Sequence, residues 1–334
     1  IKRRRVIESL RGLGLRRITC LLEHPNWASP YVDDWVEADS VRPSLATFEK
    51  VQTQIGRPDG VFCYDDYSVI VAAHLAHAFG LPGVNPVAAE RAKNKGAFRQ
   101  LCADRGLPTP RFIVIDAAED CLEAVLSEAQ LFFPLVLKPT YGAGSVLVRR
   151  ANDIKELKRA LFAYREAVTR EPAAKLWPDL SVVIEEYLVG VEVDIDMLVQ
   201  DGELRYAAVT DNFAPVEPYF MELAGQIPSA LPQAAQDELI SVAFNVLRAL
   251  CVQNCCVHFE ARWTNRGAVP IESNLRLGGA EAYEFNRGAY GVDLVAEAVR
   301  IALGLPIAPF ATAKKAVAFL RSAAFIPPVS GVLK

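Results

Sequence analysis

Two acidic residues near the end of the chain are spaced for metal chemistry. Glu260 and Glu272 each lie near the end of a strand-like run, Cys255–Arg262 and Ala268–Glu272, and a polar Thr-Asn-Arg-Gly turn joins the two runs. Neighbouring strands would bring both carboxylates onto one sheet, and carboxylate oxygens are ligands that Mg²⁺ prefers. An antiparallel hairpin with its charges on a solvated face explains the same pattern equally well.

Asn274 and Arg276 continue this pattern beyond Glu272. Alternate residues of an extended chain point to the same side, so these three side chains share a face if the strand continues. The amide oxygen would add a hard ligand, and the guanidinium would place a fixed cation beside it. Two acids, an amide and a cation on one surface suit Mg²⁺, or Mn²⁺, bound to a polyphosphate.

A second candidate site is a small-residue loop that follows an apolar run ending at Lys138. The loop consists of Thr140, Tyr141, Gly142, Ala143, Gly144 and Ser145. Its two glycines permit positive φ, so successive N–H groups are able to converge on phosphate oxygens. The order differs from the P-loop, in which the lysine follows the glycines. A plain hairpin is the alternative, but lysine seldom ends an apolar strand facing inward without an anionic partner.

The stretch Ser181–Val199 is predicted to form a strand, a short connection and a second, strongly alternating strand. Glu192, Asp194 and Asp196 fall on one face of the second strand, and the apolar residues between them fall on the other. Carboxylates stacked on one strand face repel each other unless a cation or a hydroxyl group lies beside them. Solvent would also serve, so this pattern alone decides nothing.

Composition limits the classes of function. A chain of 334 residues allows two or three domains. The net charge of −4 argues against nucleic acid as the main partner. No apolar run approaches the roughly 20 residues needed to span a bilayer, so no membrane partner is expected. Seven cysteines at irregular spacing do not form a disulfide framework and suit a reducing, cytoplasmic location.

The first 85 residues alternate short apolar runs with helical patterns, which is typical of parallel α/β units. We expect strands at Arg17–Leu22 and Gly60–Cys63 and a helix at Tyr67–Phe79. Asp66 is a plausible N-cap of that helix, and it would alternatively touch a ligand at the carboxyl end of a strand. A further helix is predicted over Ala88–Gly106, ended by two prolines before a strand at 111–115.

The order of these pieces resembles the ATP-grasp superfamily over nearly the whole chain. The matching segments are Asn94-Lys95 before Gly-Leu-Pro-Thr-Pro, Val-Leu-Lys-Pro with the small-residue loop, Glu-Glu-Tyr-Leu followed by Gly-x-Glu, and Glu260 with Glu272-x-Asn-x-Arg. Each motif is loose, but four in the correct order are specific. The resemblance implies an α/β and α+β architecture, in which an N-terminal parallel α/β domain precedes two α+β subdomains that clasp ATP.

The domain boundaries expected from this resemblance follow the motifs. Residues 1–110 would form the N-terminal domain and its connecting helix, 111–188 the lid subdomain with the glycine-rich loop, and 189–334 the C-terminal subdomain with the metal site. The chain starts at Ile1 in a helical pattern and stops in a strand-like one. We therefore expect both ends to be truncated and the last subdomain to be incomplete.

The resemblance also implies roles for individual residues. The implied ATP-binding residues are Lys95, Lys138, Thr140, Tyr141, Gly142, Ala143, Gly144, Ser145, Glu185, Glu186, Tyr187, Leu188 and Glu192. Glu185 and the main chain of the next three residues would hold adenine, and Glu192 the ribose hydroxyls. Glu260, Glu272 and Asn274 would bind Mg²⁺ or Mn²⁺. Arg276 and Lys138 would be catalytic, because they stabilise the transferred phosphoryl group.

Within the superfamily, the closest likeness is to carboxylate–amine ligases of the dipeptide-ligase and carnosine-synthase type. It rests on His258-x-Glu260, on the Leu-Arg-Leu-Gly-Gly run that holds Gly278 and Gly279, and on Glu222-Leu-Ala-Gly. These four residues, His258, Glu222, Gly278 and Gly279, are candidate substrate contacts, although a packed strand histidine is an equal reading of His258. The ligases often have Glu-Thr-Gly where this chain has Glu222-Leu-Ala-Gly. The stretch 213–232 would be a substrate-covering loop.

The implied reaction joins a small carboxylic acid to an amine or amino acid through an acyl phosphate, converting ATP to ADP and phosphate. An ATP-grasp kinase, a carboxylase-type enzyme and a non-catalytic ATP-binding module are the alternatives. The sequence leaves the oligomeric state open between a monomer and a homodimer.

Overall fold

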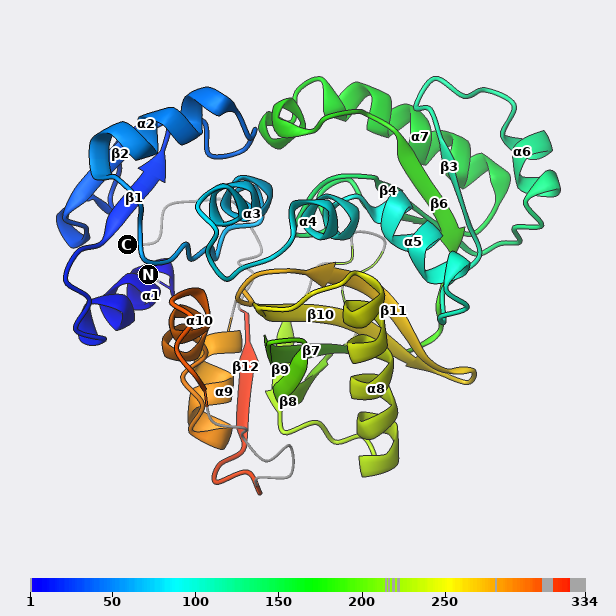
Figure 1. Ribbon diagram of the computed structural model, residues 1–334. Coiled ribbons are helices and arrows are strands. Elements are labelled where there is room, and N and C mark those ends of the chain that lie inside the picture. Colours follow the sequence, from blue (N-terminus) through cyan, green and yellow to red (C-terminus); the bar gives the residue numbers. More distant parts are fainter. Residues whose placement is uncertain are drawn as a thin grey trace, which may run out of the picture.

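Three β-sheets organise the part of the chain that the structure describes (Figure 1). They have two, four and six strands, in the orders β1-β2, β3-β6-β4-β5 and β11-β10-β7-β8-β9-β12. The computed structural model describes residues 2–213, 215, 217, 220, 223–279, 281–307 and 315–324. Glu222, a candidate substrate contact, lies outside these described residues.

The N-terminal region holds the two-stranded sheet. Its elements are α1 (Lys2–Gly12), β1 (Thr19–Leu22), the 3₁₀ helix η1 (Ser29–Tyr31), β2 (Asp34–Glu37), α2 (Leu45–Ile55) and α3 (Val69–Ala78). β1 and β2 pair in parallel, which confirms the parallel α/β prediction for this region. The strand predicted at Gly60–Cys63 is wrong, because this segment joins neither of the two strands in a hydrogen-bonded ladder.

The start of α3 also differs from the prediction. Ser68, and not Asp66, occupies the N-cap position, and its side chain makes no capping hydrogen bond. Asp66 forms ion pairs with Lys93 and Arg276 instead. Two cations outcompete the backbone N–H groups of a helix end for this carboxylate, so Asp66 belongs to the site described below.

The helix predicted over Ala88–Gly106 is two helices, α4 (Pro86–Lys93) and α5 (Lys95–Asp104). Asn94 separates them in an extended conformation, and its side-chain oxygen accepts a hydrogen bond from the N–H of Ala97. Asn is among the strongest N-cap residues, so this local bond outweighs continuation of one helix. The break places Lys95 at a helix start, where its N–H donates to the carbonyl of Thr140.

The four-stranded sheet is antiparallel throughout and lies at the upper right in Figure 1. It comprises β3 (Phe112–Ile115), β4 (Leu135–Pro139), β5 (Arg149–Ala151) and β6 (Val182–Glu186), accompanied by α6 (Leu122–Glu128), α7 (Ile154–Val168) and the 3₁₀ helix η2 (Pro172–Leu176). Leu157, Leu161 and Tyr164 form a buried stripe at helical spacing on α7. That stripe packs with Leu135, Leu137 and Ile184 of the sheet in one core.

The six-stranded sheet positions most of the acidic candidates. Its strands are β7 (Gly190–Gln200), β8 (Glu203–Asn212), β9 (Ala224–Ile227), β10 (Cys255–Thr264), β11 (Gly267–Asn274) and β12 (Leu320–Ala323), and its helices are α8 (Gln233–Ala249), α9 (Ala282–Tyr290) and α10 (Leu294–Ala302). β9 lies inside the 213–232 stretch, for which the sequence predicts a substrate-covering loop, so this part of the stretch is a strand, and the covering role stays a prediction.

The two faces of β7 alternate as the sequence predicts. Val193, Ile195 and Met197 are fully buried in a core that also contains residues of α4, α5 and α8. Glu192, Asp194 and Asp196 point to the opposite face and line a cavity. On that face α9 and α10 cover only part of the sheet, over a core that includes Leu198 and Tyr206.

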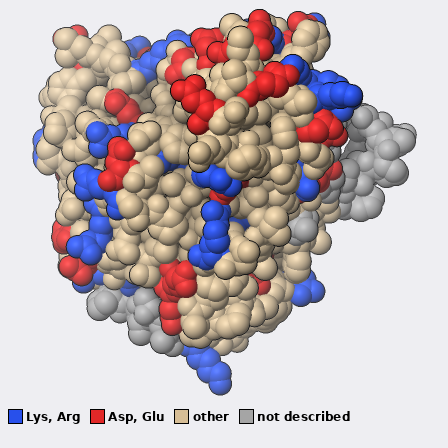
Figure 2. Space-filling model, turned by 90° about the vertical axis from the view of Figure 1, so that its right-hand side faces the viewer, with Lys and Arg blue, Asp and Glu red and all other residues tan. Residues whose placement is uncertain are grey.

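The molecular surface is mixed in charge on the face shown in Figure 2, where acidic and basic side chains are interspersed with broad uncharged areas. All seven cysteines are free thiols. Within the described ranges, the structure has no helix long and apolar enough to cross a membrane.

Candidate active site

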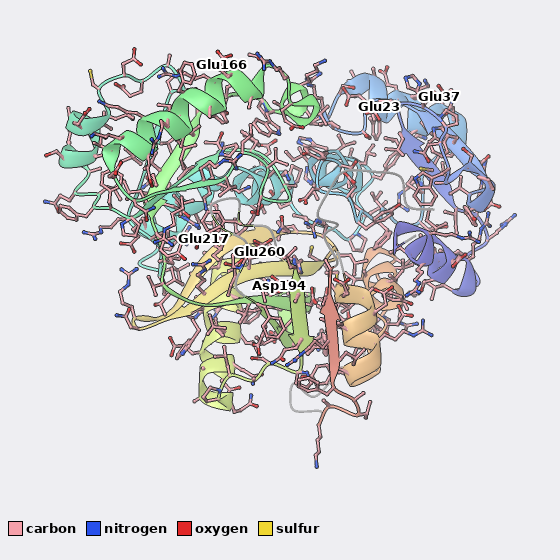
Figure 3. The ribbon with its side chains drawn as sticks, turned by 180° about the vertical axis from the view of Figure 1, so that it is seen from behind. Glu23, Glu37, Glu166, Asp194, Glu217 and Glu260 are labelled. Carbon is pink, nitrogen blue, oxygen red and sulfur yellow. The ribbon has the colours of Figure 1, made fainter. Side chains whose placement is uncertain are left out.

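A cavity of about 510 Å³ lies between the four-stranded and the six-stranded sheets. The predicted site residues that line it are Lys95, Lys138, Tyr141, Gly142, Ala143, Gly144, Ser145, Glu185, Glu186, Tyr187, Leu188, Glu192, His258, Glu260, Glu272, Arg276 and Gly279. Glu260 and Asp194 lie near the centre of the molecule in Figure 3, whereas Glu23, Glu37 and Glu166 lie on its outer parts. The structure thus brings together residues from positions 95 to 279.

Lys138 is held at the cavity by a buried ion-pair network. Its Nζ lies 2.6 Å from Oε1 of Glu185, and Nε of Arg99 lies 2.8 Å from Oε2 of the same carboxylate. Burial lowers the pKa of Lys138 to about 8, against the attraction of Glu185. Burial would raise the pKa of Glu185, but Arg99 and Lys138 outweigh it and hold that pKa at about 2. One carboxylate oxygen of Glu185 therefore holds the lysine while the other is anchored by Arg99.

Sequence reasoning missed Arg99, which is 0% exposed. Its position in α5, three residues before buried Cys102, places it on an inward face at helical spacing. That spacing was the available signal, because a charged residue on an apolar helix face requires a buried partner.

The small-residue loop has the backbone that its sequence predicts. Gly142 and Gly144 adopt positive φ values of 143° and 62°. The loop is fixed at its start by Thr140, whose hydroxyl donates to Asp179 at 3.0 Å and which does not line the cavity. Lys95 reaches it from α5, with Nζ 3.2 Å from the carbonyl oxygen of Gly142.

Glu260 and Glu272 are direct partners across β10 and β11, which confirms the pairing of the two predicted strands. Nζ of Lys95 lies 3.2 Å from Oε1 of Glu272. Asn274 is buried beside them and donates from Nδ2 to Oε1 of Glu260 at 3.2 Å, without lining the cavity. No group of three or more His, Cys, Asp and Glu side chains among the described residues is arranged to hold a metal. The acidic centre is therefore a pair of carboxylates.

Arg276 enters the cavity beside this pair. Its Nη2 lies 2.6 Å from Oδ2 of Asp66, and Nζ of Lys93 lies 3.1 Å from Oδ1 of the same carboxylate. Burial would lower the pKa of Arg276, but Asp66, Glu260 and Glu272 outweigh it and raise that pKa. Arg276 thus remains a cation, and its bond to Asp66 fixes the orientation of the guanidinium group.

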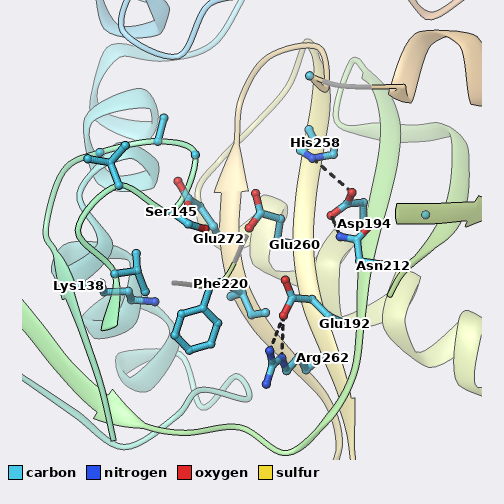
Figure 4. Close-up of a pocket in the computed structure, with 18 of the residues that line it drawn as sticks. Lys138, Ser145, Glu192, Asp194, Asn212, Phe220, His258, Glu260, Arg262 and Glu272 are labelled. Atoms are coloured by element: carbon cyan, nitrogen blue, oxygen red, sulfur yellow. Dashed lines mark hydrogen bonds and ion pairs between the residues drawn. The ribbon is translucent and has the colours of Figure 1, made fainter. Parts of the chain in front are cut away.

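Glu192 and Tyr187 also line the cavity, and Figure 4 shows Glu192 beside Arg262. Nε and Nη2 of Arg262 lie 2.8 and 2.6 Å from Oε2 of Glu192, which ties the two strands together. The guanidinium of Arg150 lies 4.2 Å from the ring centroid of Tyr187, whose hydroxyl donates to Glu217 at 2.6 Å. These polar contacts leave one oxygen of Glu192 free of the arginine.

His258 is both packed and exposed to the cavity (Figure 4). Its Nδ1 lies 2.8 Å from Oδ1 of Asp196, and its Nε2 lies 3.8 Å from Oδ2 of Asp194. Burial would lower the pKa of His258, but the two aspartates outweigh it and raise that pKa to about 10. Burial raises the pKa of Asp194 to about 6. His258 is therefore packed in its strand and also borders the cavity, and its contact with a substrate stays a prediction.

Both the fold and the sequence match known proteins. Residues 131–284 match the family model described as an ATP-grasp domain. An L-amino acid ligase from Bacillus licheniformis superposes with a TM-score of 0.78, covering 98% of this chain and 77% of that chain at 22% identity. The chain has the ATP-grasp fold. This result confirms the predicted resemblance and fold class.

Sequence relatives point to a narrower group of ATP-grasp proteins. Carnosine synthase 1 of Gallus gallus is 29% identical over 314 residues, covering 90% of this chain and 34% of that protein. The alanine–anticapsin ligase of Bacillus subtilis is 27% identical over 297 residues, covering 81% and 59%. The chain spans about a third of the length of the carnosine synthase and under two thirds of the bacterial ligase. One of these relatives is named as a synthase and the other as a ligase.

The ATP-grasp fold itself extends beyond ligases of this kind. A biotin carboxylase from Campylobacter jejuni, solved as a beta-gamma-ATP complex, has a TM-score of 0.69 and 17% identity, covering 91% of this chain and 69% of that chain. Fold likeness at that identity carries no substrate information. The fold alone therefore does not specify the reaction, which depends on the residues of the site.

Gly278 offers a stability test of the packing around His258. A Cβ at Gly278 would lie 2.7 Å from Nδ1 of His258 and 2.5 Å from Cβ of Ala282. Gly278→Ala is therefore expected to cost about 1–3 kcal/mol of unfolding free energy, since overpacking forces neighbours to move. Gly279→Ala is the matched control, because a Cβ there meets nothing within 4 Å. Equal urea midpoints for the two variants would refute the close packing.

Proposed function

We propose that the protein is an ATP-dependent carboxylate–amine ligase, which forms an amide through an acyl phosphate and releases ADP and phosphate. One observation carries the proposal. A glycine-rich loop with lysines beside it and a facing pair of carboxylates, Glu260 and Glu272, share one cavity. The carnosine synthase and the alanine–anticapsin ligase among the sequence relatives support the same reaction class.

The residues of the cavity fit Mg-ATP. Lys95, Lys138 and Arg276 supply three cations, and the positive-φ loop supplies backbone N–H groups for phosphate oxygens. Mg²⁺ is usually held by one or two carboxylates together with substrate phosphates, which matches a two-carboxylate centre. Mn²⁺ would accept the same donors. When bound, such a cation neutralises charge on the phosphates and aligns them for transfer.

Individual roles follow from these contacts and extend the sequence predictions. Glu260 and Glu272 would hold the cation, and Asn274 would orient Glu260, with its own ligation of the metal still a prediction. The main chain of residues 186–188 would meet adenine, while Glu185 would act by holding Lys138 in place. The free oxygen of Glu192 would accept from a ribose hydroxyl.

The chemistry requires positioning and charge neutralisation, with no side-chain nucleophile. A carboxylate oxygen of the acid attacks the γ-phosphorus, the bond to the bridging oxygen breaks, and ADP leaves. The amine, after its ammonium form has released one proton to solvent, then attacks the acyl carbon through its nitrogen lone pair, the carbon–oxygen bond to phosphate breaks, and the nitrogen releases a second proton to the departing phosphate. Lys138 and Arg276 would stabilise the charge of the transferred group, and the loop would exclude water.

Arg276→Lys tests the reaction centre. Lysine keeps the charge but loses the bidentate fork that matches phosphate oxygens. We expect the rate of acid-dependent ADP release to fall about a hundredfold, the loss typical of removing one charge-stabilising donor. Arg266→Lys is the control, since Arg266 is half exposed on the β10–β11 turn. Equal turnover of the Arg276→Lys and Arg266→Lys variants would remove Arg276 from the centre.

The decisive experiment is an ADP-release screen that crosses a panel of carboxylic acids with a panel of amines and amino acids. ADP formed only when both are present, with an amide detected by mass spectrometry, is the expected result. A phosphorylated product formed in stoichiometric amount without an amine would establish a kinase instead. ADP release that requires bicarbonate would indicate a carboxylase-type enzyme, and Mg-ATP binding without turnover a non-catalytic module. Light scattering on the same sample distinguishes a monomer from a homodimer.

A further inference from the structure

One row of polar side chains crosses the six-stranded sheet at the cavity floor. Glu272 pairs with Glu260, Glu260 pairs with Asp194, and Asp194 pairs with Thr210 across four successive strands. All four residues line the cavity. The proposed function uses the first two for a cation, so the row continues beyond that centre with two side chains that have no assigned role.

Asp194 is held in a fixed orientation. Its Oδ1 accepts from Nδ2 of Asn212 at 2.9 Å, as Figure 4 shows, while its Oδ2 is 3.8 Å from Nε2 of His258. The second distance is too long for a hydrogen bond. Oδ2 is therefore able to accept a donor from the cavity.

Asp196, the neighbouring acid on the same face of β7, is fully engaged. It accepts from Nδ1 of His258 at 2.8 Å and from Nδ2 of Asn286 at 2.7 Å. Asn286 in turn accepts from the hydroxyl of Tyr206 at 2.6 Å. This buried network fixes His258, which limits where the Asp194 side chain can lie.

Thr210 is an independent sign of a ligand. The side chain is buried, with 6% exposure, and it lines the cavity next to Asp194. Among the contacts of the described part of the chain, none gives its hydroxyl a hydrogen-bond partner. This hydroxyl is therefore available to a ligand in the cavity.

We propose that Asp194 and Thr210, with His258 behind them, form the subsite that binds the ammonium group of the amine substrate. This inference rests on the proposed ligase function and names where the second substrate binds. A primary ammonium has three N–H donors, and the subsite presents a carboxylate oxygen and a hydroxyl oxygen to accept them. Asp194 and Asp196 together carry two negative charges, so the subsite attracts a cation even when His258 is protonated.

The other substrate fits less well. The acidic row would repel the carboxylic acid substrate, which makes that substrate a poor match for Asp194. The strand register also favours the amine. Asp194 and Glu260 are directly paired, and the Cα atoms of such pairs in antiparallel strands lie only about 4.5–5.5 Å apart. Asp194 would therefore place the amine next to Glu260, beside the site of phosphoryl transfer.

The test separates amine binding from acid activation. Hydroxylamine, which is largely uncharged at neutral pH, attacks an acyl phosphate at carbon, releases phosphate and leaves a hydroxamate. Hydroxamate formation therefore reports formation of the acyl phosphate, and it does so with a nucleophile that carries no ammonium group. Ethylamine and L-alanine are the probes, and each is titrated for its ability to suppress hydroxamate formation, as a competing nucleophile or as an inhibitor.

For wild-type protein we expect ATP- and acid-dependent hydroxamate formation that both probes suppress. Asp194→Asn keeps the shape of the side chain and removes its charge, so we expect at least a tenfold higher half-suppressing concentration of each probe, measured against the variant's own rate of hydroxamate formation without the probe. Asp201→Asn, the same change in the exposed β7–β8 turn, should behave as wild type. Thr210→Val should raise the half-suppressing concentration by a smaller factor, and Thr210→Ser should restore it.

The outcomes separate the two proposals. If wild-type protein forms no hydroxamate with any acid of the panel, the ligase function itself fails. If hydroxamate forms but neither probe suppresses it, or if Asp194→Asn leaves suppression unchanged, the ammonium subsite is wrong and the ligase function stands. If Asp194→Asn does not fold, as judged by circular dichroism, the Thr210→Val and Thr210→Ser pair decides by the same readout.

Discussion

Glu272→Gln is expected to lower acid-dependent ADP release about a thousandfold, the upper range for loss of one charge-stabilising group. Glu272 faces Glu260 directly across β10 and β11, and these two carboxylates are the proposed cation ligands. Gln keeps the volume of the side chain but removes half of the negative charge of the pair. The rate should be measured over a range of Mg²⁺ and Mn²⁺ concentrations, because weakened ligation predicts partial recovery at high metal.

Glu203→Gln is the matched control for this prediction. Glu203 lies at the exposed start of β8 in the same sheet and does not line the cavity. Its variant should retain the wild-type rate and metal dependence. If the Glu272→Gln and Glu203→Gln proteins turned over at the same rate, Glu260 and Glu272 would not be the cation ligands.

The second large effect is on stability. Glu185→Gln is expected to lower the free energy of unfolding by about 3 kcal/mol, the lower end of the range for breaking a buried ion pair. Glu185 neutralises Arg99 and Lys138 together, and the three side chains are all buried. Gln would leave two buried cations close together without a counter-charge. Urea unfolding followed by circular dichroism measures the change.

Glu186→Gln supplies an internal comparison on the same strand. Glu186 also pairs with two arginines, but Arg111 and Arg266 are about half exposed. Exposed pairs are worth about 0–1 kcal/mol, so this variant should be close to wild type. Similar losses for the Glu185→Gln and Glu186→Gln variants would mean that burial does not govern the network. The prediction would then be wrong.

The parts of the site that lie on strands were predictable from sequence. Alternation alone placed Glu192, Asp194 and Asp196 on one face of β7, because side chains in a strand point to opposite faces in turn. The short turn between two apolar runs predicted that Glu260 and Glu272 would lie close together. In both cases the information is local, so a single sequence is enough to carry it.

The parts that depend on distant contacts were not predictable. Arg99 meets Glu185 across 86 positions, and Asp66 meets Arg276 across 210. No local pattern encodes such partners, and for Asp66 the local pattern favoured a helix cap. The break at Asn94 was missed for a related reason, since one side-chain hydrogen bond decided between one helix and two.

The double contact of Lys95 has a thermodynamic consequence. One ammonium group touches the glycine-rich loop at Gly142 and the carboxylate of Glu272. A divalent cation on Glu272 would compete with that ammonium, and a released Lys95 would alter the preferred position of the loop. Linkage is reciprocal, so a loop position that holds Lys95 away from Glu272 must strengthen cation binding by the same factor. The affinity for the cation and the position of the glycine-rich loop would then both report the same coupling free energy.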